Sequence, residues 1–179
     1  MKGMIFTEFL ELVDSRFSLD MTERLIEMSH LPSEGIYTSI GTYDIQEMVT
    51  LVTNLSNLSG VPVPDLLREF GRHLFKRFLI SYPAFFEGVG SSLEFLPRVE
   101  DYVHVEVRKL YPDAELPSFT CTTPEPGAMI MTYRSKRNLP DLAEGLILAC
   151  IEHFGEPLTV RRETGQGDPP ETRFIISPK

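Results

Sequence analysis

Hydrophobic residues in the first part of the chain recur every three or four positions, a spacing that is typical of helices. The clearest stripe runs from Leu67 to Phe78, and Gly71 within it removes a side chain, so that another segment can approach this helix closely. The pattern predicts helices over residues 2–16, 21–28, 43–56, 61–80 and 93–110, with a loop over 33–42 and a connection over 81–92.

The pattern changes after about residue 112, where short alternating runs and Pro/Gly turns are typical of strands. It predicts strands over 119–122, 129–135, 158–164 and 172–177, a helix over 140–153, and a hairpin turn over 165–170. Helices followed by strand–strand–helix–strand–strand indicate an α+β fold. We therefore expect a single domain over 1–179. Its helical N-terminal lobe, about 1–112, precedes a lobe of about 113–179 with a four-stranded antiparallel sheet and a helix.

Composition and charge narrow the class of protein. The net charge of −9 argues against a nucleic-acid or anionic-membrane surface. The longest apolar runs, such as 146–151, are too short to span a bilayer, and an acidic residue near the start argues against a signal peptide. Cys121 and Cys150 are too few for a disulfide framework, and Cys150 lies in an apolar helical run that predicts packing. We expect a cytoplasmic protein with reduced thiols.

Tyr133, Ser135 and Arg137 alternate between a predicted strand and a predicted helix. In an extended segment this spacing directs all three side chains to one face. A guanidinium beside two hydroxyl groups suits a pair of carboxylates or a phosphate. The same alternation is also common on an ordinary solvated strand face, so this motif alone leaves both interpretations open.

His104 is the most informative histidine. His30 lies in a turn, His73 flanks an apolar stripe, and His153 lies in the last turn of a helix, where the helix dipole favours positive charge. His104 lies mid-helix between two valines, without a His or Cys at the spacing of a helical zinc pair. A lone helical histidine suits haem, which needs one axial imidazole and an anion site for two propionates. A buried histidine with a purely structural role remains the alternative.

These residues occur in a recognisable context. His104 lies in Val-His-Val-Glu-Val-Arg-Lys-Leu-Tyr-Pro-Asp-Ala-Glu-Leu-Pro-Ser-Phe, Tyr133-x-Ser135-x-Arg137 follows downstream, and the chain starts Met-Lys-Gly and contains Phe-Gly71-Arg. With these motifs the sequence resembles the haem-nitric oxide/oxygen binding (H-NOX) domain, which is related to the haem sensor of soluble guanylate cyclase. The resemblance covers essentially the whole chain.

The resemblance implies a haem b (iron protoporphyrin IX) between the two lobes. His104 would be the proximal iron ligand, while Tyr133, Ser135 and Arg137 would bind the propionates and Pro117 would press on the porphyrin. The apolar residues expected to contact the haem or line its distal side are Ile5, Leu146, Phe78 and Leu74.

The distal pocket decides which gas binds. Oxygen-binding relatives carry a distal tyrosine, supported by a tryptophan and an asparagine; the matching positions here are Leu142, Phe9 and Leu74. All three are apolar, so the resemblance implies nitric oxide sensing with oxygen excluded, and carbon monoxide is a further candidate ligand. We expect nitric oxide to weaken the bond to His104, which frees the nearby helix, relaxes the pressure from Pro117 and shifts the lobes.

The sequence shows no kinase, cyclase or methyl-accepting segment, so we expect a sensor, not an enzyme. Its partner would be a separate protein such as a histidine kinase or a cyclic-di-GMP enzyme. Some relatives carry a cysteine-rich zinc site near the C-terminus, but no cysteine follows Cys150, which predicts no zinc. Alternatives are a peroxidase-type haem enzyme using Arg72 or His73, and a non-haem interaction module. A hydrolase is the weakest alternative, because Ser135 lacks a Gly-x-Ser-x-Gly context.

Overall fold

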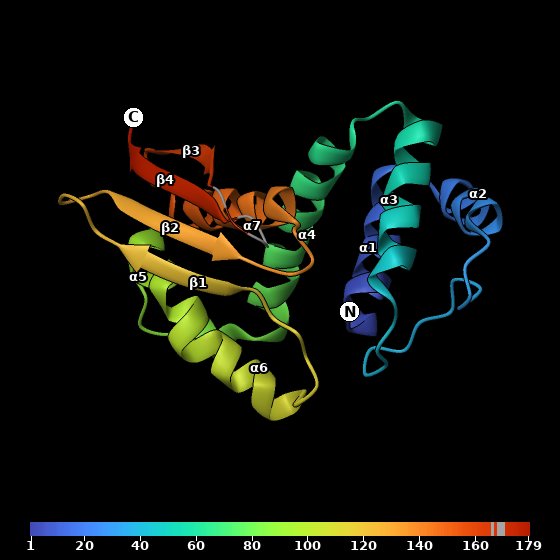
Figure 1. The fold of residues 1–179 in the computed structure, drawn as a ribbon, viewed down its shortest axis with the longest axis horizontal. Helices are drawn as coiled ribbons and strands as arrows, with labels where there is room; N and C mark the ends of the chain where they lie inside the picture. The colour runs from blue at the N-terminus through green and yellow to red at the C-terminus, as the bar shows by residue number, and fades with distance from the viewer. Residues whose placement is uncertain (166, 168–170) are drawn as a thin grey trace.

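The computed structural model describes residues 1–165, 167 and 171–179. Figure 1 shows the sheet and α5–α6 at one end of the molecule, α1–α3 at the other, and α4 and α7 between them. The helices are α1 (Gly3–Arg16), α2 (Leu19–Ser29), α3 (Ile45–Ser59), α4 (Val63–Ser81), α5 (Ser92–Arg98), α6 (His104–Leu110) and α7 (Pro140–Phe154), with a 3₁₀ turn η1 (Pro83–Phe86) and a π turn η2 (Val99–Val103).

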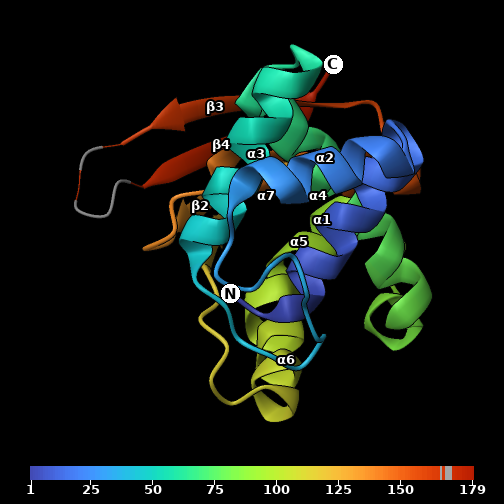
Figure 2. The ribbon, with the colours of Figure 1, turned by 90° about the vertical axis from the view of Figure 1, so that its right-hand side faces the viewer.

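The strands are β1 (Ser118–Thr122), β2 (Met129–Arg134), β3 (Leu158–Thr164) and β4 (Thr172–Pro178). They form one four-stranded antiparallel sheet in the order β1-β2-β4-β3. Figure 2 shows the β3–β4 hairpin at the edge of the molecule. The α+β prediction with this sheet and one helix is confirmed; of the predicted hairpin turn, residues 166 and 168–170 lie outside the described residues.

The side chains pack into two hydrophobic cores that meet within α4. Leu74 belongs to the core built with α1, α2 and α3, whereas the next residue, Phe75, belongs to the core beneath the sheet. Phe95 of α5 also packs in the sheet core, together with Cys150, which is buried as predicted. The cores therefore do not divide near residue 112, because α5 and the end of α4 cover the sheet.

The helices α4 and α7 touch through glycine. A Cβ on Gly71 would lie 2.3 Å from the Leu142 carbonyl oxygen, and one on Gly145 would lie 2.1 Å from the Arg68 carbonyl oxygen. Both distances are shorter than any real contact, so the two backbones can cross here only without side chains. The close approach expected at Gly71 is therefore found, and α7 is the segment that makes it.

The long helix predicted over 93–110 is interrupted. The helix begins at Ser92, after Ser91 whose side chain accepts a hydrogen bond from the Glu94 amide, and Pro97 lies inside α5. The π turn η2 follows, and the His104 amide closes it on the Val99 carbonyl oxygen. A proline inside a helix removes a backbone hydrogen bond, and a π turn widens the helix locally. As a result His104 begins a separate, seven-residue helix.

Among the described residues, no helix is both long and apolar enough to cross a membrane.

Candidate functional site

A cavity of about 290 Å³ lies where the two cores meet, between α1, α4, α6, α7 and the β1–β2 edge of the sheet. Its wall is mainly aliphatic and aromatic, with a small group of polar residues. Of the predicted site residues, those that line it are Ile5, Leu74, Phe78, His104, Pro117, Tyr133, Ser135, Arg137, Leu142 and Leu146. The fold thus brings together residues that lie more than a hundred positions apart in the sequence.

His104 is buried, with 7% of its surface exposed. Its Nδ1 lies 3.2 Å from Glu100 Oε2, which also accepts a hydrogen bond from the Phe119 amide at 3.0 Å. Since a carboxylate can only accept, Nδ1 donates and Nε2 keeps its lone pair for another ligand. Burial lowers the pKa of His104, and the hydrogen bond that Nδ1 donates to Glu100 partly opposes this. A neutral imidazole that is oriented by a carboxylate is suited to bind a metal.

Glu100 is a site residue that the sequence reasoning missed. It lies four positions before His104, so its side chain shares a helix face with the imidazole. The signal was therefore present in the sequence, and the π turn between the two residues does not separate them. Through Glu100 the imidazole is connected to the amide of Phe119 in β1, whose ring centroid lies 5.7 Å from that of His104.

The Tyr133/Ser135/Arg137 motif reaches the cavity in a different way from the one predicted. Strand β2 ends at Arg134, and the chain then turns through Asn138, whose φ is 46°. Only Tyr133 is therefore in the extended segment, while Ser135 and Arg137 approach from the turn. Asn is one of the few non-glycine residues that readily adopts this left-handed conformation.

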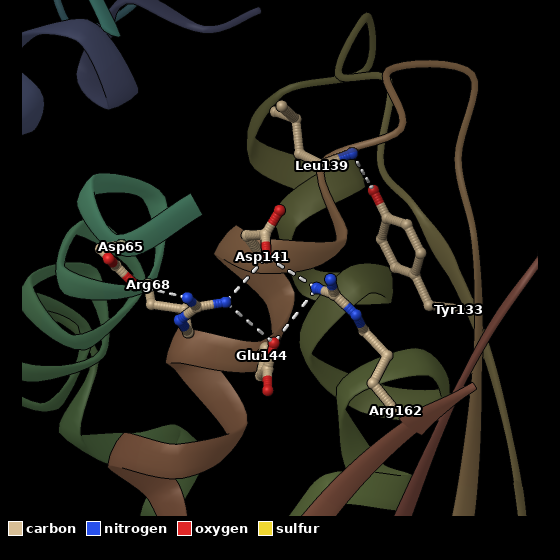
Figure 3. Close-up of polar contacts among 7 residues, drawn as sticks. All are labelled: Asp65, Arg68, Tyr133, Leu139, Asp141, Glu144 and Arg162. Carbon is tan, nitrogen blue, oxygen red and sulfur yellow. Dashed lines mark hydrogen bonds and ion pairs between the residues drawn. The ribbon is translucent and has the colours of Figure 1, made fainter. Parts of the chain in front are cut away.

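The hydroxyl and guanidinium groups of this motif are held in place by their neighbours. The Leu139 amide donates to the Tyr133 hydroxyl at 3.0 Å (Figure 3), and the Arg137 amide donates to Ser135 Oγ at 3.2 Å. Arg137 Nη1 donates to the Glu115 carbonyl oxygen at 2.9 Å. The guanidinium is partly exposed and retains further N–H groups, so it can bind an anion at the mouth of the cavity.

Phe9 is the one predicted contact residue that does not line the cavity. It is fully buried in the helical core, where its ring packs edge-on against Phe70 with centroids 5.2 Å apart. Ile5, one turn earlier on α1, occupies the cavity wall instead. Phe9 therefore supports the distal wall from behind.

Tyr82 is a second residue that the sequence reasoning missed. It follows Phe78 by one helical turn, lines the cavity, and donates its hydroxyl hydrogen to Met4 Sδ at 3.8 Å. Burial, followed by the influence of Tyr111, raises its pKa. The spacing from Phe78 would have identified it.

Arg72 and His73, the acid–base candidates for a peroxidase, are both engaged elsewhere. Arg72 forms an ion pair with Glu152, and His73 Nε2 lies 2.9 Å from Glu8 Oε2. Neither residue lines the cavity.

The residues of the cavity fit a haem. The aliphatic and aromatic walls match the porphyrin faces, the Nε2 of His104 can bind iron, and Arg137 with Tyr133 and Ser135 can hold the propionates. Fold and site together define a haem-binding domain.

The Haem-NO-binding family model matches residues 2–162, and the chain therefore belongs to this family, the H-NOX domains, which bind haem and sense gases. An H-NOX protein from K. algicida with unliganded Fe(II) is 41% identical, with a TM-score of 0.92, over 100% of this chain and 97% of that one. The H-NOX of Shewanella woodyi, solved with IWP-051 in the Fe(II)CO state, is 39% identical, with a TM-score of 0.84, over 100% of this chain and 95% of that one.

A curated relative extends the similarity to a larger protein. The soluble guanylate cyclase gcy-35 of Caenorhabditis elegans is 24% identical over 156 residues, which are 82% of this chain. The chain spans only 22% of the length of that cyclase.

Proposed function

We propose that this protein senses nitric oxide at a ferrous haem b, excludes oxygen, and signals to a separate protein. The apolar distal wall is the observation that carries this proposal. The side chains that α1, α4 and α7 contribute to the cavity, within the described part of the chain, carry no hydroxyl, amide or ring N–H group. The wall includes Ile5, Leu74, Leu142 and Leu146.

The absence of such a donor bears on gas selectivity because the ligands differ in charge distribution. Bound oxygen carries partial negative charge and is stabilised by a hydrogen-bond donor, whereas nitric oxide binds ferrous iron strongly without one. Tyr82, the residue after α4, also lines the cavity, but its hydroxyl hydrogen is already donated to Met4 Sδ. We propose carbon monoxide as a further ligand, supported by the Fe(II)CO state of the S. woodyi relative.

In this proposal His104 Nε2 would bind the iron, Glu100 would orient the imidazole, and Arg137, Tyr133 and Ser135 would hold the propionates. The haem supplies the iron to which the gas binds. Pro117 and Ile5, which both line the cavity, would contact the porphyrin and constrain its shape. If the His104 imidazole were released from the iron, α6 would be free to move relative to α1 and α4. The short length of α6 and the π turn before it support such a movement.

The receiver of the signal would be a separate protein such as a histidine kinase or a cyclic-di-GMP enzyme. Domains of this family signal to partner proteins. We propose that this signalling occurs in the cytoplasm and that the chain acts as one sensor domain without enzymatic activity. We also propose that it binds no zinc and has neither nucleic acid nor a membrane as a partner.

Absorption spectra of the reduced protein under argon, air and nitric oxide test the proposal. We expect no change under air, and under nitric oxide a shift to the spectrum of haem without an axial imidazole. His104→Gly should lose the axial ligand and regain it on addition of free imidazole, whereas His30→Asn should behave as the unmodified protein. A stable oxygen complex would contradict oxygen exclusion, and an unchanged spectrum in His104→Gly would contradict the iron ligand.

A further inference from the structure

Three polar side chains join the N-terminus of α1 to the segment that follows α6. Lys2 Nζ lies 2.7 Å from Asp113 Oδ1, and the Thr42 hydroxyl donates to Asp113 Oδ2 at 2.9 Å. Lys2 Nζ also donates to Thr42 Oγ1 at 2.9 Å. We call these residues the Lys2–Thr42–Asp113 cluster. All three line the mouth of the cavity, and both views show the N-terminus beside the α6–β1 connection (Figure 1 and Figure 2).

The Lys2 side of the cluster is firmly placed. Lys2 and Thr42 form an antiparallel bridge, and the Gly3 amide donates to the Gly41 carbonyl oxygen at 2.8 Å. A Cβ on Gly3 would lie 1.9 Å from the Thr38 carbonyl oxygen, so the loop and α1 are in backbone contact. The Lys2 side chain is only 13% exposed, and its Nζ lies over the Tyr111 ring, 5.5 Å from the ring centroid. Its ammonium group therefore has a defined position.

Asp113 lies in the segment of residues 111–117, which joins two parts of the proposed haem site. Residues 111–117 connect the C-terminal end of α6, the helix that begins with His104, to Pro117 in the cavity wall. Arg137 holds the same segment at the Glu115 carbonyl oxygen, with an N–O distance of 2.9 Å. Hydrogen bonds from Lys2 and then Thr42 lower the pKa of Asp113, so its carboxylate is ionised at neutral pH. The segment is thus attached at two points, one on each side of Ala114.

We propose that Lys2, Thr42 and Asp113 are positioning residues that hold segment 111–117, and with it α6 and Pro117, in the arrangement in which His104 is bound. The proposal rests on the proposed function, because its consequence is a restraint on the release of His104. A movement that carries α6 and the segment after it away from α1 would separate Asp113, three residues after the end of α6, from Lys2 and Thr42. The cluster therefore couples the proximal helix, through the segment that follows it, to the N-terminal end of α1.

The expected effect of removing the cluster depends on how far Asp113 is exposed to water. Asp113 is 60% exposed, so water competes for its carboxylate. An exposed ion pair alone changes an equilibrium by less than about fivefold, and a hydrogen bond to a charged group adds to this. We expect removal of the cluster to speed the release of His104 by about three- to tenfold.

The variant Asp113→Asn tests this, with Glu125→Gln as a control that makes the same change of charge in an exposed turn. Stopped-flow absorbance after mixing the ferrous protein with nitric oxide gives the rate of imidazole loss. Hydrogen exchange of the α6 amides in the unliganded ferrous protein gives a second readout. We expect Asp113→Asn to raise both rates, Glu125→Gln to raise neither, and Lys2→Met to add little to Asp113→Asn.

The outcomes separate this proposal from the proposed function. If the unmodified protein never loses the imidazole under nitric oxide, the proposed signalling step is wrong, and α6 exchange still reports on the cluster. If Asp113→Asn and Glu125→Gln show the same exchange rates of the α6 amides and the same rate of His104 release, the cluster does not position α6. Fully additive effects of Lys2→Met and Asp113→Asn on these rates would also overturn the proposal, since substitutions within one contact do not have additive effects.

Discussion

The two walls of the cavity are built in opposite ways. The proximal wall consists of η2, α6 and the segment to β1, and polar contacts hold it: His104 to Glu100, Glu100 to the Phe119 amide, and Arg137 to Glu115. The distal wall consists of α1, α4 and α7, which present aliphatic and aromatic side chains to the cavity and include the glycine contact between α4 and α7. The ion pairs that also join these helices do not line the cavity.

This difference indicates which wall can move. Helices α4 and α7 cannot shift much without losing close backbone contact, and close-packed interiors resist small displacements. The proximal helix α6 is seven residues long, follows a π turn, and exposes 40% of Val105 and 61% of Leu110. Few apolar contacts and a short helix are typical of segments that open at low free-energy cost. We therefore expect ligand-driven motion on the proximal side and a fixed distal side.

The largest effect is expected at the glycine contact between α4 and α7, which tests whether the distal wall is fixed. In Gly145→Ala the new methyl group would overlap the Arg68 carbonyl oxygen, so α4 and α7 must separate. We expect the free energy of unfolding in urea to fall by about 3 kcal/mol, the upper end of what overpacking usually costs. Gly90→Ala is the control, because the nearest atom to its Cβ would be 3.9 Å away. Equal stabilities of the two variants would show that the distal wall is not rigid.

A donor placed on the distal wall should change gas selectivity without moving the wall. Leu142→Tyr adds a hydroxyl to a residue that lines the cavity. A hydrogen bond to a ligand with partial negative charge should contribute about 2 kcal/mol, or about a thirtyfold gain in oxygen affinity. The absorption spectrum under air measures this. Leu142→Phe, which adds the ring without the hydroxyl, should leave oxygen binding unchanged; a gain with Phe would point to steric causes.

On the proximal wall, the charge of Glu100 should tune the iron ligand. Glu100→Gln keeps the size of the side chain but removes the carboxylate charge that orients His104. Loss of such a partner typically lowers metal affinity by about tenfold or more. We expect about tenfold faster haem transfer to an acceptor protein and a lower iron–histidine stretching frequency. Glu106→Gln, in the same region but paired with exposed Lys109, should match the unmodified protein.

The helices and strands were largely predictable because their patterns are local. The apolar stripe from Leu67 to Phe78 identifies α4, and alternation identifies β2. The interruption at η2 was not predicted, because the residues around Pro97 keep a helical spacing even where the backbone changes its hydrogen bonding. The division of the cores within α4 depends on long-range packing of Phe75 against the sheet, which a pattern along the chain does not show.

The site was predictable in its chemistry more than in its geometry. His104 and the Tyr133/Ser135/Arg137 motif line one cavity, but the motif turns at Asn138 where an extended segment was expected. Phe9 has the helical spacing of a wall residue relative to Ile5, and only contact with Phe70 shows that it lies behind the wall. Residue roles within this cavity stay predictions until the variants are measured.

The smallest effect is expected at the charged residues that surround the α4–α7 crossing, away from the side chains that line the cavity. Arg162 Nη1 donates to Asp141 at 2.7 Å and to Glu144 at 3.1 Å, and Arg68 approaches the same two carboxylates (Figure 3). Because the Arg162 side chain is 32% exposed, water weakens these contacts, and we expect Arg162→Met to lower the free energy of unfolding by roughly 1 kcal/mol, less at high salt.

The neighbouring residue provides a matched control for this measurement. Arg161 is 70% exposed and pairs only with Glu163 among the ion pairs of the described residues, so Arg161→Met should leave stability nearly unchanged. Neither variant should alter the rate of nitric oxide binding, since packing and the glycine contact hold the distal wall. If Arg162→Met changed that rate while Arg161→Met did not, the charges around the crossing would be part of what fixes the wall, and the contrast between an apolar fixed wall and a polar movable one would have to be revised.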